Sequence, residues 1–116
     1  MDSLGVPLSL GADGRGVVLG LASIDLNVNE VSWPAGDGVG LHRNDELDVL
    51  LVVIAGAATV SVDATDHRIS AGQILLVPKG AARSVTAGPE GVRYLTCHRR
   101  RGPIGLSASA PPAGRV

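Results

Sequence analysis

Residues 72–83 of the chain are Gly-Gln-Ile-Leu-Leu-Val-Pro-Lys-Gly-Ala-Ala-Arg, and this stretch decides the fold. The apolar run at residues 74–77 stands between a glycine and a Pro-Lys-Gly turn, which is typical of a short buried β-strand. Pro78 fixes the backbone of the turn, and Gly80 allows the positive φ that a barrel corner requires. Arg83, a permanent cation, follows this corner directly.

The rest of the chain repeats this pattern of short apolar runs separated by turns. The runs are rich in β-branched residues and are bounded by Gly, Pro, Asp and Asn. No window of ten residues has a convincing helical period, so we predict an all-β fold with almost no helix. Residues 11–14, 63–66 and 88–91 are expected turns between neighbouring strands. We expect strands at residues 6–10, 16–21, 24–33, 47–55, 58–62, 67–69, 74–77, 83–86 and 92–99.

The composition fits one small domain with an aliphatic core. The chain has 116 residues, of which 45% are hydrophobic, with no Phe, one Trp and one Tyr. We expect one barrel domain over residues 1–106 and a mobile tail at 107–116, which is rich in Ala, Ser, Pro and Gly. The formal net charge of −1 gives no general attraction to nucleic acid or to an anionic membrane, so neither is an expected partner.

The sequence also predicts a cytoplasmic location. Residues 1–10 lack the basic region and the long apolar run of a signal peptide. The longest apolar run, residues 49–55, is too short to span a bilayer. Cys97 is the only cysteine, so no internal disulfide can form, which fits a reducing compartment.

A second glycine-rich stretch lies upstream of the first. Residues 33–42 are Trp-Pro-Ala-Gly-Asp-Gly-Val-Gly-Leu-His, and Gly56 follows as a further anchor. Together with residues 72–83, this stretch resembles the two sequence motifs of the cupins, and the resemblance covers residues 28–99. The chain is similar to small single-domain cupins of the conserved-barrel type. The resemblance implies a double-stranded β-helix, or jelly-roll barrel, that binds small molecules in its mouth.

The cupin motifs carry four metal ligands, which are a His-x-His pair, a Glu and a second-motif His. Only the first of these positions holds a good ligand here, His42. Asn44 offers a weak carbonyl oxygen, Val49 offers none, and Arg83 would repel a metal cation. We therefore predict no metal in the standard site and no other cofactor. Counted from the glycine and proline anchors, the four positions are His42, Asn44, Val49 and Arg83.

A non-standard metal site is an open alternative. His42, Asn44, Glu46 and Asp48 recur at every second position, so an extended chain would project all four from one face. A β-bulge could then move Asp48 into the place that Val49 takes by counting, and His98 could complete the site. The other interpretation is a polar loop between two strands, and the pattern does not decide between the two.

Arg83 is the most suggestive single residue, because the second motif directs it into the barrel where a His would stand. A buried guanidinium needs a carboxylate or an anionic ligand. An internal salt bridge to Glu46 or Asp48 is one alternative, and a ligand carboxylate or phosphate is another. A solvent-facing Arg83 is the third.

The predicted function is binding of a small polar or anionic molecule in the barrel, without standard metal chemistry. The alternatives are a cofactor-independent isomerase, epimerase or cyclase, a metal-dependent cupin with unusual ligands, and a purely structural domain. Candidate general bases are His42 and His98. Cys97 points away from His98 by alternation and is expected to be a small buried hydrophobe. The candidate ligand-binding residues are Arg83, Asn44, Glu46, Asp48, Trp33 and Tyr94.

One strand predicts a partner subunit. Residues 49–54 are apolar at every position, and such a strand is covered on both faces. In a barrel one face looks inward, so the other requires an added N-terminal strand or a second chain. We therefore expect a homodimer.

Overall fold

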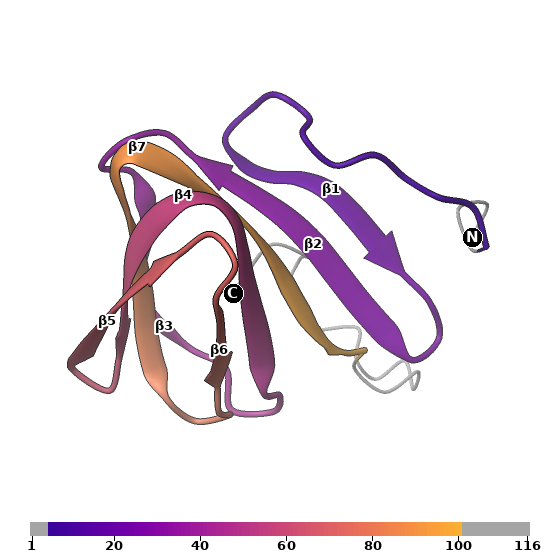
Figure 1. Cartoon of the computed structure of the whole chain (residues 1–116). Coiled ribbons are helices and arrows are strands. Elements are labelled where there is room, and N and C mark those ends of the chain that lie inside the picture. Colours follow the sequence, from indigo (N-terminus) through magenta and orange to yellow (C-terminus); the bar gives the residue numbers. More distant parts are fainter. Residues whose placement is uncertain (1–4, 101–116) are drawn as a thin grey trace.

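The computed structural model describes residues 5–100, and these form strands and no helix (Figure 1). The prediction of an all-β fold is confirmed, whereas the expected tail at 107–116 lies outside the described residues. Because residues 5–100 are free of helix, they contain no helical segment that could cross a membrane. The strands are β1 (Gly16–Ala22), β2 (Leu26–Trp33), β3 (Gly38–Arg43), β4 (Val49–Val62), β5 (Thr65–Ser70), β6 (Ile74–Val77) and β7 (Ala82–Arg99).

The two longest strands, β4 and β7, bend in the middle and contribute to two sheets. Their halves at residues 50–56 and 92–99 lie between β2 and β6, which gives a first sheet of order β1-β2-β7-β4-β6. Their other halves, at 58–62 and 82–87, lie between β3 and β5, which gives a second sheet of order β3-β7-β4-β5. All pairs are antiparallel, and the two sheets fold over one another as a jelly-roll barrel (Figure 1).

The bend depends on two glycines that face each other at the corner. Gly56 has φ +71° and Gly91 has φ +78°, a backbone region that side chains disfavour. A Cβ on Gly56 would clash with the carbonyl oxygen of Gly91. The expected turn at residues 88–91 is therefore wrong: β7 does not reverse there, because β4 and β7 stay paired on both sides of the corner.

The N-terminal segment also differs from expectation. Residues 6–10 form no strand, so the predicted hairpin at 11–14 is wrong as well. Pro7 removes one ladder donor, and the segment is anchored instead by a 2.8 Å hydrogen bond from Gly11 N to Glu30 Oε2. The hairpin expected at 63–66 is confirmed and is tighter than predicted. Its turn is Asp63-Ala64, with both φ positive (48° and 69°).

The core between the two sheets is mainly aliphatic and includes a few buried polar side chains. β4 and β6 supply aliphatic side chains such as Val49, Leu51 and Val77. β2 and β7 supply the buried polar side chains of Asn29, Thr96 and Arg83. The apolar cluster comprises Val31, Val49, Leu51, Val53, Ala58, Val60, Ile69, Val77, Ala81, Val85, Ala87, Val92 and Tyr94.

Two glycines of β3 provide a matched test of the close approach between strands. A Cβ on Gly38 would clash with the backbone carbonyl of Val85, whereas a Cβ on Gly40 would meet no atom. We expect Gly38→Ala to lower the free energy of unfolding by about 3 kcal/mol or more, and Gly40→Ala to change it by less than about 1 kcal/mol. Urea denaturation followed by circular dichroism measures both. Equal effects would contradict this packing of β3 on β7.

Candidate functional site

Arg83 lies in the second sheet with its side chain inside the barrel. The residue is 1% exposed, and its register partners are His42 on β3 and Val62 on β4, so these three share a face. All three guanidinium nitrogens are buried and have no hydrogen-bond partner within residues 5–100. Burial lowers the pKa of Arg83, against an opposing effect of Tyr94, but an arginine remains a cation at neutral pH. Within residues 5–100, Arg83 is therefore a buried cation without a hydrogen-bond partner.

The inner face of the first sheet supplies further polar groups. Tyr94 is 2% exposed and is close enough to Arg83 to interact with it electrostatically. Thr96 follows two residues later on the same face and is the register partner of Asn29 on β2. Thr96 Oγ1 and Asn29 Oδ1 are buried and, like the guanidinium, lack a partner within residues 5–100. These three residues, Arg83, Thr96 and Asn29, thus lie along the inward face of β2 and β7.

Tyr94 is held in place by Trp33. The indole Nε1 of Trp33 donates a 3.1 Å hydrogen bond to Tyr94 Oη, so the phenol keeps its own proton to donate elsewhere. Burial raises the pKa of Tyr94 to about 12, although the Trp33 hydrogen bond and the Arg83 charge lower it. The phenol is therefore a donor at neutral pH and a poor general base.

Tyr94 is the only tyrosine, so its ionisation can be followed directly by ultraviolet absorbance. We expect a midpoint near pH 12 in the folded protein and near pH 10 in urea. The pKa of Tyr94 is higher in the folded state than in the unfolded state. Burial of the neutral phenol therefore contributes fully to the free energy of unfolding below pH 10, and this contribution is lost as the pH rises towards 12. The free energy of unfolding should fall by about 2–3 kcal/mol across this window, and Tyr94→Phe should remove that dependence. A folded-state midpoint near pH 10 would contradict the burial of this phenol.

The loop after β3 does not place the alternating polar residues Glu46 and Asp48 inside the barrel. β3 ends at Arg43, and Asn44 Oδ1 accepts hydrogen bonds from the backbone N–H groups of Glu46 (2.9 Å) and Leu47 (3.1 Å). This is an Asx turn, so the extended chain that the alternating pattern required is absent. Glu46 and Asp48 are exposed, and Asp48 Oδ1 accepts from Lys79 N at 2.8 Å. The expected internal salt bridge to Arg83 is not formed within residues 5–100.

The two candidate bases differ in position. His42 lies beside Arg83 by register, and its Nδ1 is 2.8 Å from the carbonyl oxygen of Gly40. His98 lies at the end of β7, half-buried, with Nδ1 2.9 Å from its neighbour's carbonyl oxygen. A carbonyl can only accept, so in each histidine Nδ1 carries a proton and donates it to the carbonyl oxygen. Of the two, His42 shares the face and the strand pair of Arg83.

The residues present do not fit the metal centre that the cupin motifs imply. Of the four ligand positions, Arg83 is a buried cation, and Asn44 uses its carbonyl oxygen in the loop turn. Within residues 5–100 there is no group of three or more His, Cys, Asp or Glu that could hold a metal ion. The non-standard set of His42 with Glu46 or Asp48, and with His98, likewise forms no such group within residues 5–100.

We expect the purified protein to carry no stoichiometric iron, zinc, manganese or nickel at this site, because the buried Arg83 charge disfavours a second cation. Elemental analysis after dialysis measures this, with Arg83→His as the informative variant, since it restores a ligand at the motif position. One tightly held ion per wild-type chain, lost on His42→Ala, would contradict the prediction.

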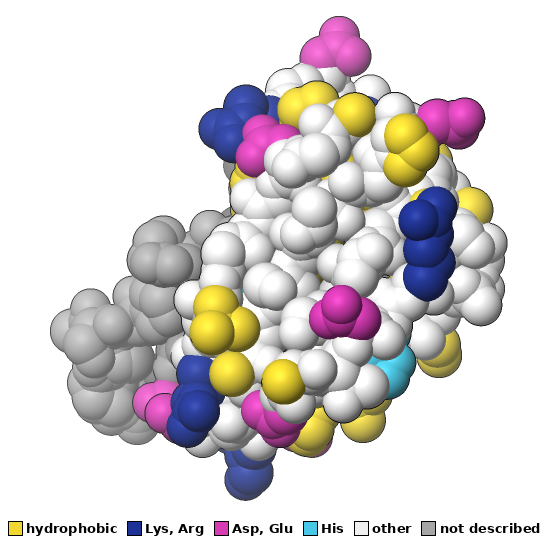
Figure 2. Space-filling view, turned by 90° about the vertical axis from the view of Figure 1, so that its left-hand side faces the viewer, with side chains coloured by type: hydrophobic (Ala, Val, Ile, Leu, Met, Phe, Trp, Pro, Cys, Tyr) yellow, Lys and Arg dark blue, Asp and Glu magenta, His cyan; other side chains and the backbone are white. Residues whose placement is uncertain are grey.

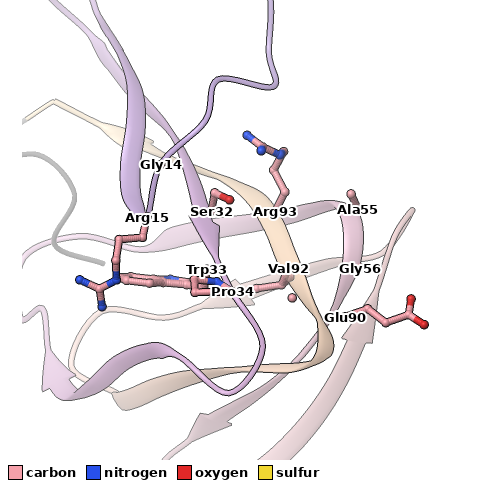
Figure 3. Close-up of a pocket in the computed structure, with 11 residues that line it drawn as sticks. Gly14, Arg15, Ser32, Trp33, Pro34, Ala55, Gly56, Glu90, Val92 and Arg93 are labelled. Carbon is pink, nitrogen blue, oxygen red and sulfur yellow. The ribbon is translucent and has the colours of Figure 1, made fainter.

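A pocket of about 320 Å³ lies outside the barrel, at the corner that Gly56 and Gly91 form (Figure 3). Its cations already have partners. The Arg15 guanidinium lies 5.2 Å from the centroid of the Trp33 ring and 2.6 Å from Asp37, whose pKa its hydrogen bond lowers. Arg93 lies 2.6 Å from Glu30 Oε2. We therefore place the candidate site at Arg83, in the interior.

Sequence patterns indicated Arg83, Tyr94, Trp33 and His42 but missed Asn29. A signal for it was available in the strand Leu26-Asn-Val-Asn-Glu-Val, where Asn27 and Asn29 alternate with apolar residues. Amides at alternate positions of a strand share one face. When that face points into a barrel, they become part of its lining.

Comparisons with known proteins agree with this architecture. The chain is 30% identical over 103 residues to the dimethylsulfoniopropionate lyase DddW of Ruegeria pomeroyi, covering 81% of this chain and 67% of that protein. The chain belongs to the cupin family. No family model matches the sequence.

Solved structures of other cupins share the fold at low sequence identity. A cupin protein of Bacteroides fragilis superposes with a TM-score of 0.70 at 20% identity, over 84% of this chain and 86% of that one. The cupin domain of Cnp3 from Schizosaccharomyces pombe gives 0.66 at 20% identity, over 82% and 72%. KdgF of a Halomonas species gives 0.67 at 20% identity, over 73% and 78%. These likenesses concern the fold alone.

Proposed function

We propose that this cupin binds a small carboxylate inside its barrel, with Arg83 as the anchoring residue. The observation that carries the proposal is the buried guanidinium, whose three nitrogens have no hydrogen-bond partner within residues 5–100. Burying an unpaired charge costs several kcal/mol, so a protein that keeps one has a use for it. A carboxylate matches the planar fork of donors that arginine presents.

The surrounding side chains support an anion rather than a cation. The hydroxyl groups of Tyr94 and Thr96 can donate to a ligand held by Arg83, and no carboxylate of the described chain accepts from that guanidinium. The aliphatic side chains of β4 and β6 complete the lining. A short carbon chain ending in a carboxylate suits such a half-polar, half-aliphatic interior. We also propose that the protein is cytoplasmic and does not bind nucleic acid.

Arg83→Leu separates a ligand-binding role from a structural one. We expect it to weaken binding of a small carboxylate such as propionate or dimethylsulfoniopropionate by more than about 100-fold, because two charge-assisted hydrogen bonds are lost. Without ligand, Arg83→Leu should raise the free energy of unfolding by about 1–3 kcal/mol, because it removes a buried charge and leaves no internal carboxylate unpaired. Isothermal titration calorimetry and thermal unfolding measure the two effects.

Two controls sharpen this experiment. Arg43→Leu removes an exposed arginine of the neighbouring strand and should leave binding unchanged. Propionamide, an uncharged analogue of propionate, should not bind the wild type. If Arg83→Leu lowers stability by about 3–5 kcal/mol instead, Arg83 forms an internal ion pair and the proposal fails. Inorganic phosphate in the same titration tests the other small anion that arginine recognises.

A second candidate function is lyase activity on such a carboxylate, which the kinship with DddW favours. Dimethylsulfoniopropionate carries a carboxylate at one end and a sulfonium group at the other. Removal of a proton from the carbon next to the carboxylate forms a carbon–carbon double bond, breaks the carbon–sulfur bond and releases dimethyl sulfide and acrylate. We assign His42 as the base, because it lies beside Arg83 by register.

Gas chromatography of dimethyl sulfide tests this activity directly. The wild type should release it from dimethylsulfoniopropionate, His42→Ala should not, and His67→Ala, which removes an exposed histidine of β5, should behave as the wild type. Binding of the carboxylate without any release would leave the binding function and exclude the lyase.

A further inference from the structure

Asn29 and Thr96 form a second polar position on the inward face of the first sheet. Thr96 is 0% exposed and Asn29 is 2% exposed, and the two residues are register partners on β7 and β2. Thr96 Oγ1 and Asn29 Oδ1 have no hydrogen-bond partner within residues 5–100. A buried polar atom without a hydrogen bond destabilises the fold, so the pair indicates a bound group that satisfies both atoms.

The Asn29–Thr96 pair lies one row along the sheet from Tyr94. Thr96 follows Tyr94 by two residues, so both side chains point to the same face, about 7 Å apart along β7. Tyr94 in turn is close enough to Arg83 to interact with it electrostatically. Gly20 stands opposite Asn29 on β1, and a Cβ there would come within 3.3 Å of Asn29 Oδ1. The missing side chain of Gly20 thus leaves space beside this oxygen.

The two unpaired atoms define the chemical group that fits between them. Asn29 Oδ1 can only accept a hydrogen bond, whereas the Thr96 hydroxyl can donate one and accept one. An ionised carboxylate has no donor, so it cannot satisfy Asn29. A hydroxyl group can donate to Asn29 and accept from Thr96 at the same time. An ammonium group would add a second cation near the buried Arg83 charge, and Coulomb repulsion disfavours that arrangement.

We infer that the ligand is a hydroxycarboxylate, whose carboxylate binds Arg83 and whose hydroxyl binds the Asn29–Thr96 pair. The inference rests on the proposed function, because Arg83 must hold the carboxylate. A hydrogen bond covers about 3 Å of the spacing between the rows, which leaves roughly 4 Å for the ligand. A spacer of about two carbon atoms, as in 3-hydroxypropionate, spans that distance. Leu51, the buried register partner of Thr96 on β4, supplies an apolar contact for these carbon atoms.

Matched ligands test the hydroxyl. 3-Hydroxypropionate should bind the wild type more than about tenfold more tightly than propionate, because a site built to hydrogen-bond a hydroxyl discriminates against an analogue that lacks it. Lactate, whose hydroxyl lies beside the carboxylate, should bind like propionate. Isothermal titration calorimetry gives the affinities. The fluorescence of Trp33, the only tryptophan, gives a second readout through its hydrogen bond to Tyr94.

Thr96→Val and Asn29→Leu remove the two polar atoms with little change in side-chain shape. Together they should reduce the preference for 3-hydroxypropionate to less than about twofold, and Thr96→Val alone should lower it at least about threefold. Neither substitution should lower the melting temperature, because neither atom has a hydrogen-bond partner within residues 5–100 to lose. Thr65→Val is the control and should keep the full preference. It removes an exposed hydroxyl of β5, on the flank that faces the viewer in Figure 2, where hydrophobic side chains stand in small separate groups between charged ones.

The outcomes separate this inference from the proposed function. If neither 3-hydroxypropionate nor propionate binds the wild type, Arg83 is not a carboxylate anchor and both fail. If the two bind equally, the carboxylate site stands and the hydroxyl position is overturned. A buried water between Asn29 and Thr96 predicts this second result, because it satisfies both atoms without a ligand. A double variant that keeps the wild-type preference, or lactate that binds as tightly as 3-hydroxypropionate, would also overturn the inference.

Discussion

The close approach of β4 and β7 at Gly56 and Gly91 is the constraint on which the barrel depends. Both strands turn there together and remain paired before and after the corner. A side chain on Gly56 would strike the Gly91 carbonyl, so the corner excludes every other residue. Because each strand continues into the opposite sheet, one bend creates both sheets at once. It also brings Arg83, before the bend, close to Tyr94, after it.

That geometry explains why an arginine can stand where a cupin motif has a metal ligand. A metal centre would bring positive charge to the interior and bind anionic oxygen atoms there. Arg83 brings its own positive charge from the same position of the motif, and adds directional N–H donors. His42, the one remaining ligand type, lies beside it by register. A buried cation at this position would favour an anionic ligand, as a metal centre would, but through different chemistry.

The sequence predicted the sheets better than the contacts between them. Glycine and proline spacing located Arg83, and strand periodicity placed Tyr94, because both depend on local backbone geometry. The partners of Arg83 could not be predicted, because they depend on where β3 ends. Asn44 closes an Asx turn with its own loop, and this removes Glu46 and Asp48 from the interior. One local hydrogen-bond choice thus overrides a pattern that spans seven residues.

The N-terminal segment also shows that a local sequence pattern does not predict which contacts a segment makes. Residues 6–10 alternate apolar and polar as a strand does, yet form no ladder, and Val6, Leu8 and Leu10 remain 55%, 40% and 49% exposed. The buried carboxylate of Glu30 anchors the chain at Gly11 and so decides where the segment can run. Figure 1 shows it beside β1, away from β6. Within residues 5–100, this strand-like segment therefore forms no ladder. Its alternation predicts a strand, but alternation alone does not show whether a neighbouring strand is within reach.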